Sequence, residues 1–351
     1  EFYQLDFEMS FATQEDVFRV GEEVLTATFE KFAPEGSVVT AAPYPVISYK
    51  QAMLEFGSDK PDLRNPLRIV DVTDFFQRCT FKPFHGQTVR AIKVSNKMSK
   101  GFHEKLLKFA TSIGMGGLGY LEVKEDLSYK GPIDKFIPDD MKAEIREIAS
   151  LKAGDTIFFI ADKEKQAALY AGQLRNELGQ RLDLLEKNAY RFCFINDFPM
   201  YEYDEEQKKI IFTHNPFSMP QGGLEALTTK DPLELLAYQY DIVCNGVELS
   251  SGAVRNHNLD IMVKAFEIAG YTEEDLKEKF GALYNAFQYG APPHAGMAPG
   301  VDRMIMLLRN EENIREVIPF PMNGNAQDVM CGAPNEVSEM QLREVHIKVR
   351  K

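Results

Sequence analysis

Apolar and polar residues alternate strictly along the first eleven residues of the chain, EFYQLDFEMSF. A strand with one buried face produces this pattern, because successive side chains point to opposite sides. We therefore expect residues 1–11 to form a half-buried strand whose polar row contains Asp6 and Glu8. Those two carboxylates would lie roughly 7 Å apart, a spacing that favours water, a cation or a cationic ligand between them. Since the strand begins without a turn or cap, we expect an N-terminal portion to be absent. The apolar row consists of Tyr3, Leu5, Phe7, Met9 and Phe11.

Capping signals predict two helices after this strand. Thr13 is expected to open a helix that continues through Phe32, and Ser48 with Gln51 forms a capping box for a second helix that stops at Gly57. The next stretch, GSDKPDLRNP, is a charged loop restrained by two prolines.

The pattern changes between about Asp74 and Leu182, where short strands alternate with helices. This alternation predicts a self-contained α/β insertion. We place it at residues 74–185, between a first part, residues 1–73, and a last part, residues 186–351. The expected strands are residues 89–94, 119–123 and 156–161, and the expected helices are residues 100–113, 139–151 and 163–182.

A glycine run inside the insertion, Gly114 to Gly119, matches G-x-G-x-x-G. A dinucleotide-binding fingerprint has to follow a strand and open a helix. Here the glycines follow a predicted helix and lead into a predicted strand. We therefore expect a flexible turn, and no nucleotide site, at this position.

An antiparallel pattern returns after Lys187. Strands are expected at residues 191–195, 200–203 and 209–214. A helix over residues 232–240, a strand-like segment over 241–258 and a helix over 259–269 follow. Together with the first part, this predicts an α+β fold in which helices flank an antiparallel sheet.

The segment VELSSGAVR places Glu248 and Arg255 among small and apolar residues. Seven positions apart, the two would face opposite sides of a regular strand. A bulge in the run Ser250 to Gly252 would shift the phase and bring both to one face. Two interpretations stay open from this segment alone: a ligand site above the sheet, or a surface ion pair worth less than about 1 kcal/mol.

Near the C-terminal end, the stretch YGAPPHAGMAPGVDRMIMLL passes from a turn at Gly300 into an apolar helix. Asp302 suits a helix start, whereas a cation such as Arg303 costs about 0.3–1 kcal/mol there unless an anion is near. Arg303 therefore either reaches water or a carboxylate, or receives a phosphate-bearing ligand at the helix start. The expected buried helix face consists of Val301, Met304, Ile305, Leu307 and Leu308.

Composition narrows the protein class. The chain has 351 residues, 44% of them hydrophobic and 26% charged, which is ordinary for a globular protein. No apolar run approaches about 18 residues, so we expect a cytoplasmic protein. Four scattered cysteines indicate buried thiols, with neither disulfides nor a zinc site. A net charge of −13 argues against nucleic acid as a partner.

Five stretches in order carry a family resemblance: EFYQLDFEMSF, GSDKPDLRNP, HNPFSMP, CNGVELSSGAVRNHN and YGAPPHAGMAPGVDRMIMLL. They resemble the bacterial-type aspartyl-tRNA synthetases of class II, and the insertion is similar to the GAD domain. The resemblance covers essentially the whole chain. It implies a class II antiparallel sheet, with the first strand in the latter half of motif 2 and Gly300 to Arg303 in motif 3.

The resemblance implies a two-step reaction. L-aspartate and ATP would form aspartyl-adenylate, and the aspartyl group would then pass to tRNA(Asp), with tRNA(Asn) as a further option. It implies catalytic roles for Arg303 and Glu248 and a homodimer in the full-length enzyme. The implied ATP contacts are Glu248, Gly300, Val301, Asp302 and Arg303, the Mg²⁺ ligands are Asp241 and Glu248, and the aspartate contacts are Gln4, Asp6, His214 and Arg255.

Parts that the family resemblance requires would lie before Glu1. They include motif 1, the first half of motif 2 and the anticodon-binding domain, so we expect this chain alone to have little adenylation activity. Two alternatives remain. One is another class II synthetase, for asparagine or lysine, against which the insertion argues. The other is a fragment or paralogue that binds tRNA or protein without catalysis.

Overall fold

The computed structural model describes residues 2–95 and 98–350. The chain divides into a larger unit, Asp6–Ala298, and a smaller unit made of Glu1–Leu5 with Pro299–Lys351. The two units are described separately below. Within the described residues, no helix is both long and apolar enough to cross a bilayer.

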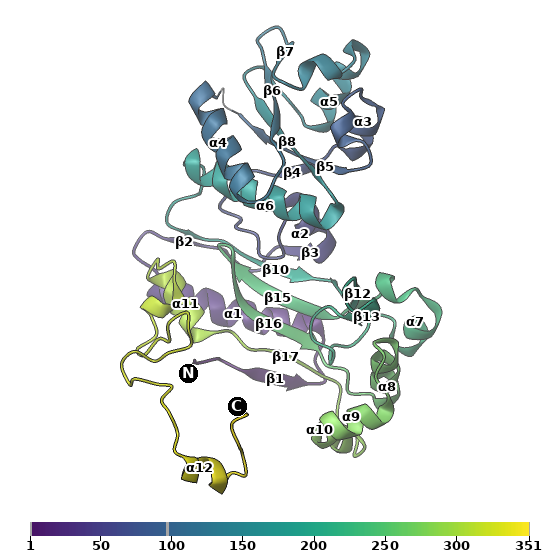
Figure 1. The fold of residues 1–351 in the computed structure, drawn as a ribbon, viewed down its shortest axis with the longest axis vertical. Helices are drawn as coiled ribbons and strands as arrows, with labels where there is room; N and C mark the ends of the chain where they lie inside the picture. The colour runs from purple at the N-terminus through teal and green to yellow at the C-terminus, as the bar shows by residue number, and fades with distance from the viewer. Residues whose placement is uncertain (1, 96–97, 351) are drawn as a thin grey trace. The chain divides into compact units, whose positions relative to one another are not determined.

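A six-stranded sheet organises one part of the larger unit (Figure 1). Its neighbouring strands pair antiparallel, except for the parallel pair β10 and β3. This confirms the predicted antiparallel sheet. In spatial order the strands are β1 (Phe7–Ser10), β17 (His294–Met297), β16 (Val247–Val254), β15 (Gln239–Cys244), β10 (Phe192–Asn196) and β3 (Val46–Ser48).

Helix α1 (Gln14–Phe32) covers one face of this sheet and begins as predicted, at a capping box formed by Thr13 and Asp16. The ring of Phe18 stacks on Phe194 of β10 at 3.8 Å between centroids. On the opposite face, α2 (Tyr49–Glu55) packs over β10 and β3 through Ala52 and Phe56. The same apolar cluster includes Val243 of β15.

The insertion is built on a second sheet, in which β4, β5, β8, β6 and β7 pair in this order. Strands and helices alternate along the chain as predicted, and every pairing is antiparallel. Apolar clusters lie on both sides of the sheet. The proposed domain boundaries stay a prediction. The elements are β4 (Ile69–Asp71), α3 (Thr73–Arg78), β5 (Thr88–Val94), α4 (Lys100–Ser112), β6 (Gly119–Val123), β7 (Tyr129–Lys130), α5 (Lys142–Ile148), β8 (Thr156–Asp162) and α6 (Glu164–Arg181).

Shorter elements complete the larger unit. The predicted strands near 200–203 and 209–214 form the hairpin of β12 and β13, and the predicted helix near 259–269 is α8. The glycine run at 114–119 joins α4 to β6, as expected for a turn. These elements are β2 (Val38–Val39), β9 (Ala189–Tyr190), β11 (Phe198–Pro199), β12 (Tyr201–Asp204), β13 (Lys209–Phe212), α7 (Gly223–Thr229), β14 (Leu236–Ala237), α8 (Leu259–Ile268), α9 (Glu273–Lys279) and α10 (Gly281–Phe287).

The prediction of a helix over residues 232–240 is wrong. Only Pro232–Glu234 form a 3-10 turn, after which the chain enters β14 and then β15. Gln239 and Tyr240 already lie in the buried central strand, so sheet pairing overrides their local preference. The helix in this region is α7, which lies earlier and packs against α8.

The expected first strand is shorter than its alternating pattern. Regular pairing begins only at Phe7, and Tyr3, Leu5 and Phe11 are 63%, 43% and 77% exposed. Phe11 leaves the strand with a left-handed backbone, φ 57°. The alternation therefore identified the strand but overestimated its buried face.

The smaller unit contains α11 (Val301–Leu308) and α12 (Glu339–Glu344). Helix α11 begins directly after Gly300, as predicted. Its buried face differs from the expected one, because Met306 is buried whereas Ile305 is 40% exposed. One cysteine also departs from expectation: Cys331 is exposed, while Cys79, Cys193 and Cys244 are buried.

Candidate functional site

The hairpin of β15 and β16 carries the acidic residues of the candidate site. Asn245 and Gly246 form its turn with φ values of 51° and 84°, a conformation that favours these two residue types. Along the hairpin, Ile242 pairs with Ser250, but the next pair is Val243 with Glu248. Leu249 is therefore an extra residue, and the predicted bulge lies one position before Ser250.

This bulge decides which side chains share a face. Residues that pair across antiparallel strands point to the same side of the sheet. Asp241 pairs with Ser251, and Val243, two positions further along the same strand, pairs with Glu248. Glu248 consequently lies on the face of Asp241 and Ser251, and Arg255 follows on that face by alternation. The sequence-based expectation that a bulge brings Glu248 and Arg255 to one face is confirmed by the register.

Small residues form the floor beside Arg255. Ala253 of β16 pairs with Gly296 of β17, which pairs with Glu8 of β1. A Cβ atom at Gly296 would lie 2.5 Å from the carboxyl carbon of Glu8, so that carboxylate lies over the glycine. Arg255 Nε donates a hydrogen bond to Glu8 Oε1 at 3.0 Å. The small residues therefore leave room above the sheet for the carboxylate that binds Arg255.

Glu8 is one of the residues of this site that the sequence-based site assignment missed; Lys60, described below, is another. The sequence did contain a signal for Glu8, since the alternating pattern places it in the same polar row as Asp6. Asp6 itself is exposed and precedes β1 on the same strand parity. The alternation could not show that Arg255, far along the chain, reaches this row.

Asp241 is buried, with only 4% of its surface exposed. Ser251 Oγ donates a hydrogen bond to Asp241 Oδ1 at 2.6 Å. Burial raises the pKa of Asp241 to about 7, and the nearby charge of Glu248 acts in the same direction, whereas the Ser251 hydrogen bond opposes it. A cation near this carboxylate would favour its ionised form.

Glu248 has a lysine next to it. Lys60 Nζ lies 3.2 Å from Glu248 Oε2 and 2.8 Å from Asp59 Oδ2. Desolvation alone would lower the pKa of Lys60, but its hydrogen bonds and charge interactions with Asp59 and Glu248 raise it. The charged loop noted in the sequence therefore brings a permanent cation to the acidic end of the face.

The two carboxylates fit the magnesium site that was expected. Mg²⁺ usually binds proteins through one or two carboxylates together with substrate phosphates. Asp241 and Glu248 share a face and supply two such groups. Across residues 2–95 and 98–350, no cluster of three or more His, Cys, Asp and Glu side chains suits a metal ion.

His214 follows β13. It is exposed, although its ring contacts two other aromatic rings. Its centroid lies 4.8 Å from that of Phe198 and 6.3 Å from that of Tyr49, both edge-on. Desolvation lowers the pKa of His214 below its ordinary value, and the nearby charge of Asp59 opposes this shift. The ring is therefore mainly neutral at neutral pH.

The smaller unit holds the remaining predicted residues. Gln4 forms a bridge with Gly300, and the backbone NH of Val301 donates to Tyr3 O at 2.9 Å. Asp302 is buried and accepts a hydrogen bond from Tyr3 N at 2.9 Å. Its carboxylate thus fixes the N-terminal segment, a role that the sequence did not indicate. Arg303 lies exposed in the first turn of α11.

Comparison with known proteins gives close relatives along the whole chain. A protein named aspartate–tRNA(Asp/Asn) ligase from Zymomonas mobilis is 55% identical, over 99% of this chain and 59% of its own length. One of the same name from Gluconobacter oxydans is 56% identical, with the same coverage. An aspartate–tRNA ligase from Streptomyces coelicolor is 53% identical, over 100% of this chain and 60% of its own length.

The chain thus spans about three fifths of the length of these relatives. The family described as tRNA synthetases class II (D, K and N) matches residues 1–324. That range includes both the bulged hairpin with Glu248 and the helix start at Arg303. The chain belongs to the class II tRNA synthetases of the D, K and N family.

Proposed function

We propose that this chain is the catalytic region of an aspartate–tRNA ligase. It would activate L-aspartate with ATP to aspartyl-adenylate, releasing pyrophosphate. It would then transfer the aspartyl group to tRNA(Asp), with tRNA(Asn) as a second acceptor, releasing AMP. The names of its relatives support this choice. The observation that carries it is the bulge in β16. Its register places Glu248 on the same sheet face as Asp241 of β15, and Arg255 follows on that face by alternation.

Arg255 is the proposed partner of the side-chain carboxylate of aspartate. Its planar guanidinium can donate two parallel hydrogen bonds to one carboxylate. Asparagine lacks the second anionic oxygen and would leave the guanidinium uncompensated, which discriminates strongly at a desolvated position. Glu8, whose carboxylate lies over Gly296, accepts a hydrogen bond from Arg255 and so holds its guanidinium from one side.

Asp241 and Glu248 are the proposed Mg²⁺ ligands, and Glu248 also contacts ATP. When bound, the ion would neutralise the phosphate charge of ATP. The two carboxylates would hold the ion, and Ser251 fixes the Asp241 carboxylate through its hydrogen bond. No nucleophilic side chain is required, because positioning and charge stabilisation suffice for attack at phosphorus.

The other site assignments are proposals of the same kind. Asp6, neutral His214 and Gln4 would contact aspartate. In the smaller unit, Arg303 would bind ATP together with Gly300, Val301 and Asp302; its position in the first turn of α11 supports an anionic ligand there. A homodimer and a cytoplasmic location complete the proposal.

Binding of a non-hydrolysable aspartyl-adenylate analogue, measured by calorimetry with Mg²⁺, tests this function. We expect saturable binding that Arg255→Ala abolishes. Arg19→Ala serves as the matched control, because Arg19 is an exposed arginine on α1 that pairs with Asp16. Unchanged binding in Arg255→Ala, or stronger binding of the asparaginyl or lysyl analogue, would refute the proposal.

A further inference from the structure

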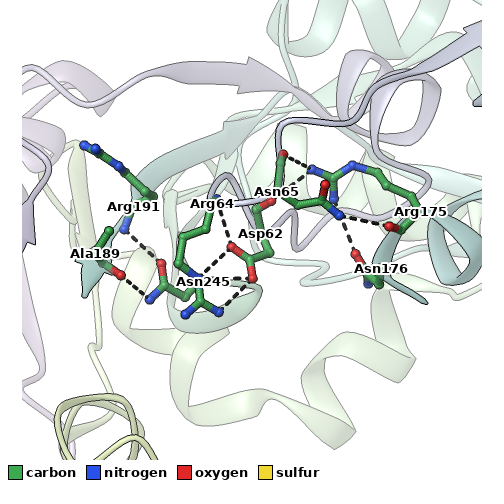
Figure 2. A network of polar contacts seen from close by, with 8 residues as sticks. All are labelled: Asp62, Arg64, Asn65, Arg175, Asn176, Ala189, Arg191 and Asn245. Atoms are coloured by element: carbon green, nitrogen blue, oxygen red, sulfur yellow. Dashed lines mark hydrogen bonds and ion pairs between the residues drawn. The ribbon is translucent and has the colours of Figure 1, made fainter. Parts of the chain in front are cut away.

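The loop between α2 and β4, residues 57–67, is anchored on a buried arginine of the insertion. Arg175 of α6 is 1% exposed. Its guanidinium donates hydrogen bonds to the main-chain oxygens of Asn65 at 2.8 Å and Asp62 at 3.0 Å (Figure 2). It also donates to the main-chain oxygen of Leu67 at 2.8 Å. These acceptors are uncharged. A buried guanidinium needs such acceptors to offset its desolvation, so the loop conformation and Arg175 depend on each other.

Two glycines of α6 bring helix and loop into backbone contact. A Cβ atom on Gly172 would lie 2.5 Å from Gly57 O, and one on Gly179 would lie 2.3 Å from Asn65 Nδ2. Asn65 Nδ2 in turn donates to Arg175 O at 2.9 Å. Gly172, Arg175 and Gly179 are spaced for one helix face. A side chain at Gly172 or Gly179 would therefore collide with the loop.

The other side of the loop reaches the hairpin of the candidate site. Asp62 pairs with Arg64, and a Cβ atom at Gly246 would touch Asp62 Cβ at 3.4 Å. Asn245, next in the hairpin turn, binds the backbone of Ala189 and Arg191 (Figure 2). Lys60, between the anchored ends, lies 3.2 Å from Glu248. The loop therefore connects α6 to the acidic end of the site.

We propose that Arg175 is a positioning residue: by clamping loop 57–67, it holds the ammonium group of Lys60 against Glu248. The insertion thereby sets the geometry of the ATP and magnesium end of the site, a consequence that rests on the proposed function. A partly exposed lysine–glutamate pair is weak by itself and pays side-chain entropy. The fixed backbone around Lys60 supplies the order that the pair lacks.

Acetylation of Lys60, followed by mass spectrometry on the whole chain, tests the clamp without reference to activity. We expect Lys60 to react about two- to fivefold faster in Arg175→Met, the range expected when a partly exposed ion pair is lost. Exposed Lys100 is the internal reference. Arg181→Met is the matched control, because Arg181 lies on the same helix but pairs with Glu177 of that helix. It should react as the wild type does.

An unchanged Lys60 rate in folded Arg175→Met would overturn the clamp. If circular dichroism shows that this variant does not fold, Arg175→Lys replaces it, since a lysine cannot reproduce the forked contacts. An unchanged Lys60 rate in Arg175→Lys would likewise overturn the clamp.

Binding of the aspartyl-adenylate analogue with and without Mg²⁺ tests the consequence for the site. We expect Arg175→Lys to lose most of the gain in affinity that Mg²⁺ gives. If Lys60 is labelled faster in Arg175→Lys but Mg²⁺ raises the affinity for the analogue as much as in the wild type, the positioning role is overturned. If the wild type binds no analogue, the proposed function fails, and the labelling rates still decide whether Arg175 holds Lys60.

Discussion

Ser251 donates a 2.6 Å hydrogen bond to Asp241, the residue directly opposite it across β15 and β16. Because Asp241 is buried, this donor offsets part of its desolvation. Ser251→Ala should lower the free energy of unfolding by about 1–3 kcal/mol, the cost of an unsatisfied buried group. Urea unfolding of the chain measures this loss. Ser112→Ala, which removes an exposed hydroxyl on α4, should change it by less than about 0.5 kcal/mol. Equal effects would contradict the role of Ser251.

Arg255→Lys keeps the charge of Arg255 and removes its forked geometry. We expect the aspartyl-adenylate analogue to bind roughly 10- to 100-fold more weakly, as the loss of charged hydrogen bonds implies. Calorimetric titration gives the affinity. Arg19→Lys on α1 should bind as the wild type does. Wild-type affinity in Arg255→Lys would show that Arg255 makes no bidentate contact with the ligand.

Gly296→Ala should disturb the floor of the site. The added Cβ would lie 2.2 Å from Phe7 O and 2.5 Å from the carboxyl carbon of Glu8, so β1 or Glu8 has to move. A stability loss of about 1–3 kcal/mol is expected from such overpacking, together with weaker analogue binding. Gly281→Ala, whose Cβ would meet nothing within 4 Å, is the control for the same chemical change. A tolerated Gly296→Ala would rule out close contact between β1 and β17.

His214→Gln should change how stability depends on pH. Desolvation lowers the pKa of His214 in the folded state, so the unfolded chain takes up this proton more readily. The contribution of neutral His214 is complete above the unfolded pKa, near 6.5, and is lost as the pH falls through the lower folded value. Acidification from about pH 7.5 to about pH 5 should therefore lower the Tm less in His214→Gln than in the wild type. His346→Gln, at an exposed position, should leave that difference as in the wild type.

Local signals in the sequence predicted the elements whose ends depend on neighbouring residues. The helix starts after Thr13 and after Gly300 are examples, since each depends on a few adjacent residues. At Ser48 only half of the predicted capping box forms: its side chain accepts from Gln51 N, and the reciprocal bond from the backbone of Ser48 is absent. The bulge near Ser250 was accessible because two charged residues had the wrong spacing for one strand face. The sequence could not identify Leu249 as the extra residue, because the pairing with β15 decides which residue of β16 has no partner.

Long-range contacts account for what the sequence did not reveal. Residues 236–240 look helical in isolation but complete strands in the folded chain. Glu8 meets Arg255 across 247 positions of sequence, and Asn65 meets Arg175 across 110. Neither pair leaves a local pattern. The roles of Glu8 and Lys60 therefore required the structure, whereas the functional assignments of the predicted site residues remain proposals.

The chain enters and leaves the insertion at neighbouring points, since Glu186 N donates to Arg64 O at 3.1 Å. The two segments that connect the insertion to the rest of the chain lie next to each other. A short loop could therefore join them in place of the insertion at a small entropic cost. Excising residues 67–184 should therefore leave the pairing of the six-stranded sheet intact. What such a shortened protein would lack is the support beneath the loop that carries Lys60, so the insertion would be dispensable for folding and needed for the precision of the site.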